Sequence, residues 1–240
     1  MLGVGLALVG CAGNPTRNAE KSADVNAQMG LRYMQQGNNE RAMDKLTRAL
    51  SFDRRHGEAN HYLAILYQRL DRPDDAEGHF RDAIRALPDD SSLLNNFGAF
   101  LCGSGRYDEG EKFLLKVLED PVYPQRGAVH ENLGLCMTRK GDLEKAESHL
   151  RKALSQNPKL HKSLFGMADL NYQSGNYLSA RAYFQRYLEV ARYTPNSLWL
   201  GIRIERKLGD RDALSSYEMH LKNRFPDSEQ ARLLQESEQK

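Results

Sequence analysis

The side chains that could do chemistry are few and scattered along the 240 residues. The chain has three cysteines, at positions 11, 102 and 136, and seven histidines: His56, His61, His79, His130, His149, His161 and His220. No two histidines stand four residues apart, and no two cysteines have the short spacing of a metal site. The sequence also lacks a phosphate-binding glycine loop and a nucleophile elbow. We therefore expect no catalysis, no metal, no cofactor and no small-molecule substrate.

Cys11 ends a stretch with the features of an export signal. Residues 1–10 are uncharged and apolar, and the chain turns polar directly after Cys11. The stretch is shorter than the roughly 20 apolar residues that span a bilayer, but it fits the apolar region of a signal peptide. Leu8-Val9-Gly10-Cys11 resembles the bacterial lipobox, which implies that Cys11 is acylated and becomes a stable membrane anchor.

The residues around this motif extend the expectation. Ala12, next to the modified cysteine, implies delivery to the outer membrane, because an aspartate there usually means retention in the inner membrane. No Lys or Arg precedes the apolar run, so we expect the natural start to lie upstream. We interpret 1–10 as the end of a signal peptide and 11–22 as a lipidated, flexible tether.

Charge and composition exclude several classes of protein. Lys+Arg 34 against Asp+Glu 32 gives a net charge of +2, whereas nucleic-acid binding needs a concentrated excess of cations. With 40% hydrophobic residues the chain can bury a core. We expect no nucleic-acid partner.

From residue 23 onward the chain repeats with a period close to 34 residues. One small residue marks five repeats (Gly30, Ala64, Gly98, Gly134 and Ala168), and Ile202 takes the same place in a sixth. Seven residues later comes a helix-ending position: Gly37, Asp71, Gly105, Gly141, Gly175 and Gly209. This pattern is typical of tetratricopeptide repeats, each a helix, a tight turn and a second helix. It predicts an all-α, right-handed superhelical solenoid.

The repeat boundaries follow from this period. We place six repeats at 23–56, 57–90, 91–126, 127–160, 161–194 and 195–227, and a C-terminal capping helix at 228–240. Two extra residues lie between repeats three and four, in the segment Pro121 to Arg126, where two prolines interrupt the helix. Either a harmless insertion or a functional loop fits this segment.

Cys102 and Cys136 fall on the first helices of repeats three and four, in apolar surroundings. The default interpretation is that both are buried small side chains with free thiols. A disulfide is the alternative, but the positions of the two cysteines within their repeats differ by two, and disulfide geometry is strict.

A superhelix of this kind binds an extended or helical segment along its concave side, which the first helices line. The apolar N-terminal part of that groove predicts that Leu31, Met34 and Ile65 are exposed. The full set expected in the protein-binding groove is Leu31, Met34, His61, Ile65, Gln68, Leu135, Phe165 and Tyr172.

Longer stretches carry a more specific resemblance. Residues 93–102 (LLNNFGAFLC), then 118–126 (LEDPVYPQR) leading into 131–135 (ENLGL), resemble the PilF/PilW family of type IV pilus biogenesis lipoproteins. The resemblance implies six tetratricopeptide repeats and a pilotin, which carries the pilus secretin to the outer membrane and promotes its multimerisation. The partners implied are the secretin and, through Cys11, the outer membrane. We expect a monomer on its periplasmic face.

Two other classes of function remain at this stage. One is another periplasmic scaffold lipoprotein, which recruits cell-wall hydrolases or outer-membrane assembly factors, and the other is an enzyme with an unrecognised site. A rival binding motif is a carboxylate clamp, because Asn96 and Asn132 occupy the position of the clamp asparagines of chaperone adaptors and Lys162 could add a cation. Gly166 stands where that clamp needs an arginine, which leaves the fork-shaped donor missing.

Overall fold

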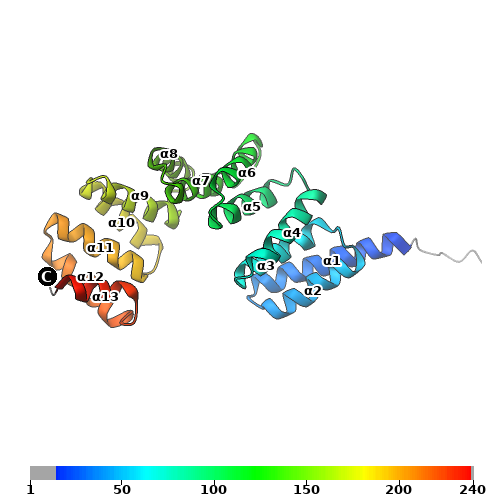
Figure 1. Cartoon of the computed structure of the whole chain (residues 1–240), viewed down its shortest axis with the longest axis horizontal. Coiled ribbons are helices and arrows are strands. Elements are labelled where there is room, and N and C mark those ends of the chain that lie inside the picture. Colours follow the sequence, from blue (N-terminus) through cyan, green and yellow to red (C-terminus); the bar gives the residue numbers. More distant parts are fainter. Residues whose placement is uncertain (1–14, 239–240) are drawn as a thin grey trace, which may run out of the picture. The chain divides into compact units, whose positions relative to one another are not determined.

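The computed structural model describes residues 15–238, and this part of the chain is built of thirteen α-helices (Figure 1). They are α1 Pro15–Gln35, α2 Asn39–Phe52, α3 Gly57–Arg69, α4 Pro73–Ala86, α5 Ser91–Gly103, α6 Tyr107–Glu119, α7 Arg126–Lys140, α8 Leu143–Gln156, α9 His161–Gln173, α10 Tyr177–Val190, α11 Pro195–Leu208, α12 Arg211–Arg224 and α13 Glu229–Glu238. No strand occurs among the described residues, so the all-α prediction is confirmed. None of these helices is both long and apolar enough to traverse a bilayer.

The turn inside each repeat depends on one residue with left-handed backbone geometry. Between the two helices of each pair, φ is positive at Gly37, Gly105, Gly141, Gly175 and Gly209, with values of 74° to 89°. Asp71 takes the same conformation, with φ 55°, and among the described residues it is the only non-glycine that does so. A side chain costs energy in this conformation, which explains why glycine fills five of the six turns.

The chain forms two compact units, Met1–Asn96 and Phe97–Lys240, which divide within α5. In the first unit, α1 packs on α2, α3 on α4, and α3 also contacts both α1 and α2. A cluster of Met34, Ala42, Leu46, Leu63 and Leu66 forms part of its core. In the second unit each helix from α6 to α12 contacts the next, and α7, α9 and α11 also contact one another in sequence.

The start of the first repeat differs from the sequence prediction. α1 begins at Pro15, so the part of the expected tether that the structure describes is helical rather than flexible. Proline suits the first turn of a helix because it lacks only an N–H that would have no helical partner there. Cys11, Ala12 and the expected signal segment at 1–10 lie outside the described residues.

The C-terminal helix α13 covers the end of the second unit. Its Ala231 and Leu234 are buried in a cluster with Leu198, Ile202 and Leu221. α13 therefore closes the last apolar helix surface of the stack, as a terminal cap must.

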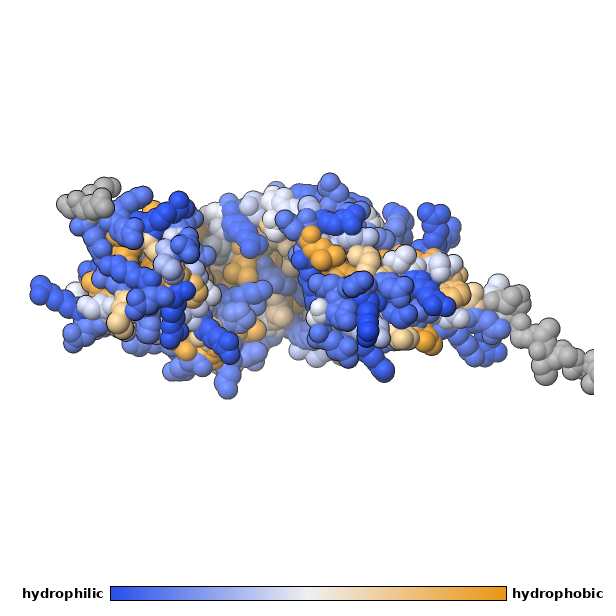
Figure 2. Space-filling view, turned by 90° about the horizontal axis from the view of Figure 1, so that it is seen from below, coloured by the Kyte–Doolittle hydropathy of each residue, from blue (hydrophilic) through white to orange (hydrophobic). Residues whose placement is uncertain are grey.

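Hydrophilic residues dominate the face shown in Figure 2, where apolar residues appear only as separate patches.

Cys102 and Cys136 form a disulfide, with 5.2 Å between their Cα atoms, so the default interpretation of free thiols is wrong. The difference of two positions between the two repeats does not prevent the bond, for a geometric reason. Side chains two positions apart point about 200° away from each other around a helix. On two similarly oriented neighbouring helices, facing side chains must point in opposite directions, so a two-position difference favours the bond between α5 and α7.

The Arg126 side chain ties the insertion between α6 and α7 to the end of α6. The Arg126 guanidinium donates hydrogen bonds to the carbonyl oxygens of Leu118, at 3.0 Å, and of Asp120, at 2.6 Å. These bonds satisfy carbonyls at the end of α6 that have no helical partner. Val122 at the tip of the loop is 85% exposed.

Candidate protein-binding site

A pocket of about 320 Å³ lies on the second unit, where α7, α9 and α11 adjoin. Its lining residues come from four helices and the α10–α11 connection: Leu135 and Arg139 of α7, His161, Lys162 and Phe165 of α9, Tyr187 of α10, and Thr194 and Asn196 at the start of α11. Leu135 and Phe165 belong to the set predicted from the sequence, and the structure places both in this pocket.

The first turn of α9 is fixed against α7 by a buried carboxylate. Glu131, in the first half of α7, accepts hydrogen bonds from the Ser163 backbone N–H, at 3.0 Å, and from the Ser163 hydroxyl, at 2.8 Å. The N–H groups of the first helical turn have no partner within the helix, so this carboxylate satisfies one of them. Lys162 and Phe165, on either side of Ser163, are thereby set at the pocket.

The start of α11 is equally well defined. The Thr194 hydroxyl accepts a hydrogen bond from the Ser197 N–H at 3.1 Å, and the Ser197 hydroxyl accepts one from the Thr194 N–H at 2.9 Å. This reciprocal capping box, with Pro195 in the first turn, is a strong helix start. It holds Thr194 and Asn196 at the edge of the pocket.

The floor of the pocket is apolar and aromatic. The Phe165 and Tyr187 rings lie with their centroids 5.6 Å apart, and Tyr187 is buried. Leu135 and Phe165 are half-buried, so each keeps an accessible surface. A floor of this kind offers contact area to one bulky side chain of a partner.

The rim of the pocket is cationic. Arg139 and Lys162 are exposed, and neither forms an ion pair or a side-chain hydrogen bond with another described residue. They are the only formally charged residues among those that line the pocket. The site therefore combines an apolar floor with unpaired positive charge.

The other residues expected in the groove have different surroundings. Met34 is 3% exposed inside the core of the first unit, so the prediction that it is exposed is wrong. His61 is 6% exposed, and neither side chain offers much surface to a partner in this structure. Met34 packs with the core because its helix position faces α2 and α3. Leu31 and Ile65 are half-buried and Gln68 is exposed.

His61 is held by a neighbouring side chain. Its Nε2 lies 3.0 Å from the Asn96 side-chain nitrogen, and burial lowers the pKa of His61 to about 4. Asn96 thus has a structural partner, which weakens the carboxylate-clamp alternative.

Tyr172 lies further along α9, outside the pocket. The Arg203 guanidinium stacks over the Tyr172 ring at 4.4 Å and pairs with Asp169 at 3.1 Å. This arrangement extends an aromatic and charged surface along the first helices of the second unit.

Sequence reasoning missed Arg139, His161, Tyr187, Thr194 and Asn196 as lining residues. A signal for two of them was present, because residues four apart share a helix face. Arg139 lies one turn after Leu135, and His161 lies one turn before Phe165. Of the remaining three, Tyr187 comes from the second helix α10 and Thr194 from the α10–α11 connection, which the first-helix pattern does not include. Asn196 lies at the very start of the first helix α11, before the positions that the pattern assigns to the groove.

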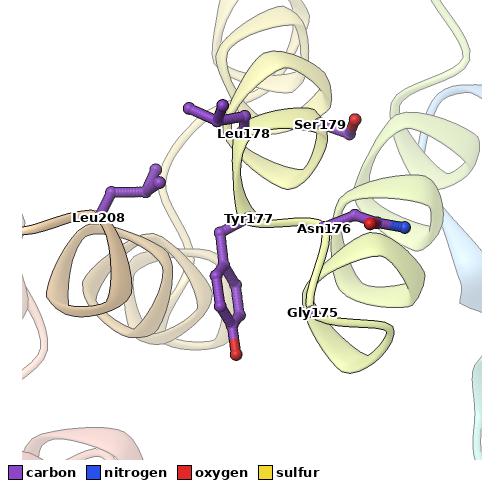
Figure 3. Close-up of a pocket in the computed structure, with 6 residues that line it drawn as sticks. All are labelled: Gly175, Asn176, Tyr177, Leu178, Ser179 and Leu208. Atoms are coloured by element: carbon purple, nitrogen blue, oxygen red, sulfur yellow. The ribbon is translucent and has the colours of Figure 1, made fainter.

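A second hollow, of about 460 Å³, lies at the turn between α9 and α10 (Figure 3). Leu178 there is 73% exposed, and the Tyr177 ring points away from it. None of its six lining residues is charged, so it offers little to specify a partner. No group of three or more metal-ligating side chains occurs in the part of the chain that the structure describes.

The comparisons with known proteins agree with this architecture. Family models described as tetratricopeptide repeat match residues 33–95, 89–159 and 125–193. The chain is 33% identical over 235 residues to the type IV pilus assembly protein PilF of Pseudomonas aeruginosa, covering 95% of this chain and 92% of that protein.

Two solved structures are similar over nearly their full lengths. The Pseudomonas aeruginosa PilF structure has a TM-score of 0.81 at 33% identity, covering 92% of this chain and 99% of that one. The structure of PilW, described as a widely conserved type IV pilus biogenesis factor, has a TM-score of 0.80 at 30% identity, covering 88% and 97%.

The fold and these matches define a tetratricopeptide-repeat protein, a class that acts by binding other proteins. Within that class, the chain belongs to the PilF/PilW family of type IV pilus biogenesis proteins.

Proposed function

We propose that this protein is a lipid-anchored pilotin of the type IV pilus: it binds the pilus secretin, brings it to the outer membrane and promotes its multimerisation. The observation that carries the proposal is the relationship to PilF and PilW over almost the whole chain. The role needs a surface for a protein segment and no catalytic group, and the pocket between α7, α9 and α11 supplies such a surface.

Two features support the proposed location on the periplasmic face of the outer membrane. The Leu8-Val9-Gly10-Cys11 motif suits acylation of Cys11, and Ala12 suits sorting to the outer membrane. The disulfide between Cys102 and Cys136 suits an oxidising compartment such as the periplasm.

The anchor gives the proposed mechanism a physical basis. Confining the protein to one membrane raises its effective concentration for a partner that assembles there. A modest affinity for the secretin is then sufficient, and the lipid becomes part of the mechanism as well as an address.

The test measures heat- and detergent-resistant secretin multimers in outer-membrane fractions, together with twitching motility. Four strains are compared: the intact gene, the deletion, Cys11→Ser, which removes the anchor, and Ala12→Asp, which keeps the lipid but favours the inner membrane. We expect multimers to vanish in the deletion and to be reduced or misplaced in both variants. Multimers that persist in outer-membrane fractions of the deletion strain would refute the pilotin role.

A further inference from the structure

The pocket between α7, α9 and α11 has two chemically distinct parts that a single ligand must match. Leu135, Phe165 and Tyr187 form the apolar floor, while Arg139 and Lys162 supply the charge at the rim. With about 320 Å³, the pocket is at the low end of the range for ligand sites. That volume suits one bulky side chain rather than a whole helix.

The carboxylates near the pocket are engaged elsewhere. Glu131 lies on the same helix as Leu135 and accepts both hydrogen bonds from Ser163. Asp169, one turn after Phe165, pairs with Arg203. Arg139 and Lys162 therefore have no neutralising partner among the described residues of this chain, and the field at the pocket favours an anionic ligand.

The placement of the two cations indicates which kind of anion fits. Arg139 lies near the end of α7 and Lys162 in the first turn of α9, so they belong to two different helices. A chain terminus supplies a single carboxylate, whereas an internal acidic segment supplies several along its length. Asparagine and threonine at the start of α11 add neutral hydrogen-bonding groups on the remaining side.

We propose that this pocket binds an internal acidic segment of a partner protein, which inserts one bulky apolar side chain between Leu135 and Phe165 and places flanking Asp or Glu carboxylates on Arg139 and Lys162. The inference rests on the proposed function in one respect, that the partner is the secretin. The chemistry of the ligand follows from the pocket alone.

The first experiment measures binding of short labelled peptides to the purified protein by fluorescence anisotropy. The main probe is Gly-Asp-Glu-Leu-Phe-Asp-Glu-Gly with an amidated C-terminus. Three comparison peptides replace its acids by Lys and Arg, replace Leu-Phe by Ser-Ser, or carry Leu-Phe at a free C-terminus without other acids. We expect the acidic apolar probe to bind most tightly, and its affinity to fall as salt rises from about 0.05 to about 0.5 M.

Variants assign the binding to the pocket. Arg139→Ala combined with Lys162→Ala removes two exposed side chains without intramolecular partners, so the fold should be unchanged. We expect about a fivefold loss of affinity for the acidic probe, in line with two solvent-accessible ion pairs. The matched control is Lys159→Ala, an exposed cation just before α9 that does not line the pocket, which should bind like the unmodified protein.

Reversing the charge of the two rim residues gives a second test of the proposal. Arg139→Glu with Lys162→Glu should prefer the Lys/Arg peptide over the acidic one. Equal binding of the acidic and basic probes, tighter binding of the free-terminus peptide, or an equal effect of Lys159→Ala and the double variant would each overturn the proposal. If secretin multimers depend on the gene but the peptides bind without this selectivity, the pilotin role stands and only the assignment of an acidic segment is refuted.

Discussion

Breaking the Cys102–Cys136 disulfide should destabilise the second unit strongly. The bond closes a loop with a sequence separation of 34 residues, and both cysteines are buried. In the chain-entropy model a loop of this length lowers the entropy of the unfolded chain by about 12 to 13 cal/mol/K, which is about 4 kcal/mol at 25 °C. For a unit of this size that corresponds to a fall in Tm of roughly 10 °C.

The assay uses a Cys11→Ser background, in which Cys102 and Cys136 are the only cysteines left. The single tryptophan, Trp199, lies on α11 and reports on the second unit by fluorescence. Urea unfolding is followed with and without a reductant. The matched control replaces both disulfide cysteines by alanine, so that the reductant has no bond to break.

We expect reduction to lower the stability of the disulfide-bonded protein and to leave the double-alanine control unchanged. A difference below about 1 kcal/mol between the oxidised and the reduced protein would contradict the loop-entropy reasoning. An equal effect of the reductant on the control would show that the change does not arise from this bond.

Three further predictions concern single positions. Asp71→Gly should stabilise the first unit by about 1 kcal/mol, because it removes a side chain from a residue with left-handed backbone geometry. Gly141→Ala, where φ is 89°, should destabilise the second unit by about as much. Urea unfolding of both variants tests this, and equal stability of Asp71→Gly and the unmodified chain would contradict it. Burial, with His149, Lys152 and Arg126 nearby, lowers the pKa of His130 to about 4, below its unfolded value of about 6.5, so stability should fall as pH drops from about 6.5 towards 4. His130→Gln should make that fall less steep, the buried His61 contributing to the remainder, and an unchanged pH profile would refute the assignment to His130. Glu131→Ala should lower the free energy of unfolding by about 1 to 3 kcal/mol, because it removes the acceptor of both Ser163 hydrogen bonds. The milder Glu131→Gln is its control. A loss of stability below about 0.5 kcal/mol in thermal unfolding of Glu131→Ala would contradict a structural role for this buried carboxylate.

The features predicted well from the sequence are those set by local backbone chemistry. The position seven residues after each marker is glycine in five repeats, and each of these glycines has a positive φ. Small residues in helices mark close approaches: a Cβ on Gly134 would come within 2.6 Å of the Leu150 side chain. Because each of these constraints requires a particular residue type, glycine or another small residue, the repeat can be recognised from a single sequence.

The features that failed depend on rotation about a helix axis. Met34 and Leu31 are three residues apart, yet Met34 is buried while Leu31 is half-buried. A shift of one residue turns a side chain by about 100° around the helix axis. A rule that assigns the same positions of every repeat to the concave side therefore misplaces residues that lie at the edge of that side. The unexpected disulfide has the same origin, since the two-position difference between Cys102 and Cys136 turns their side chains towards each other instead of apart.

The disulfide and the pocket are connected through α7. Cys136 holds one side of this helix to α5, while the preceding residue, Leu135, lines the pocket, and Glu131 ties the helix to α9. A helix held on both sides has little freedom to rotate, so Leu135 and Arg139 stay in place before any ligand arrives. Preorganisation of this kind lowers the entropy cost of binding, and it explains how a small pocket can contribute to recognition of a much larger partner.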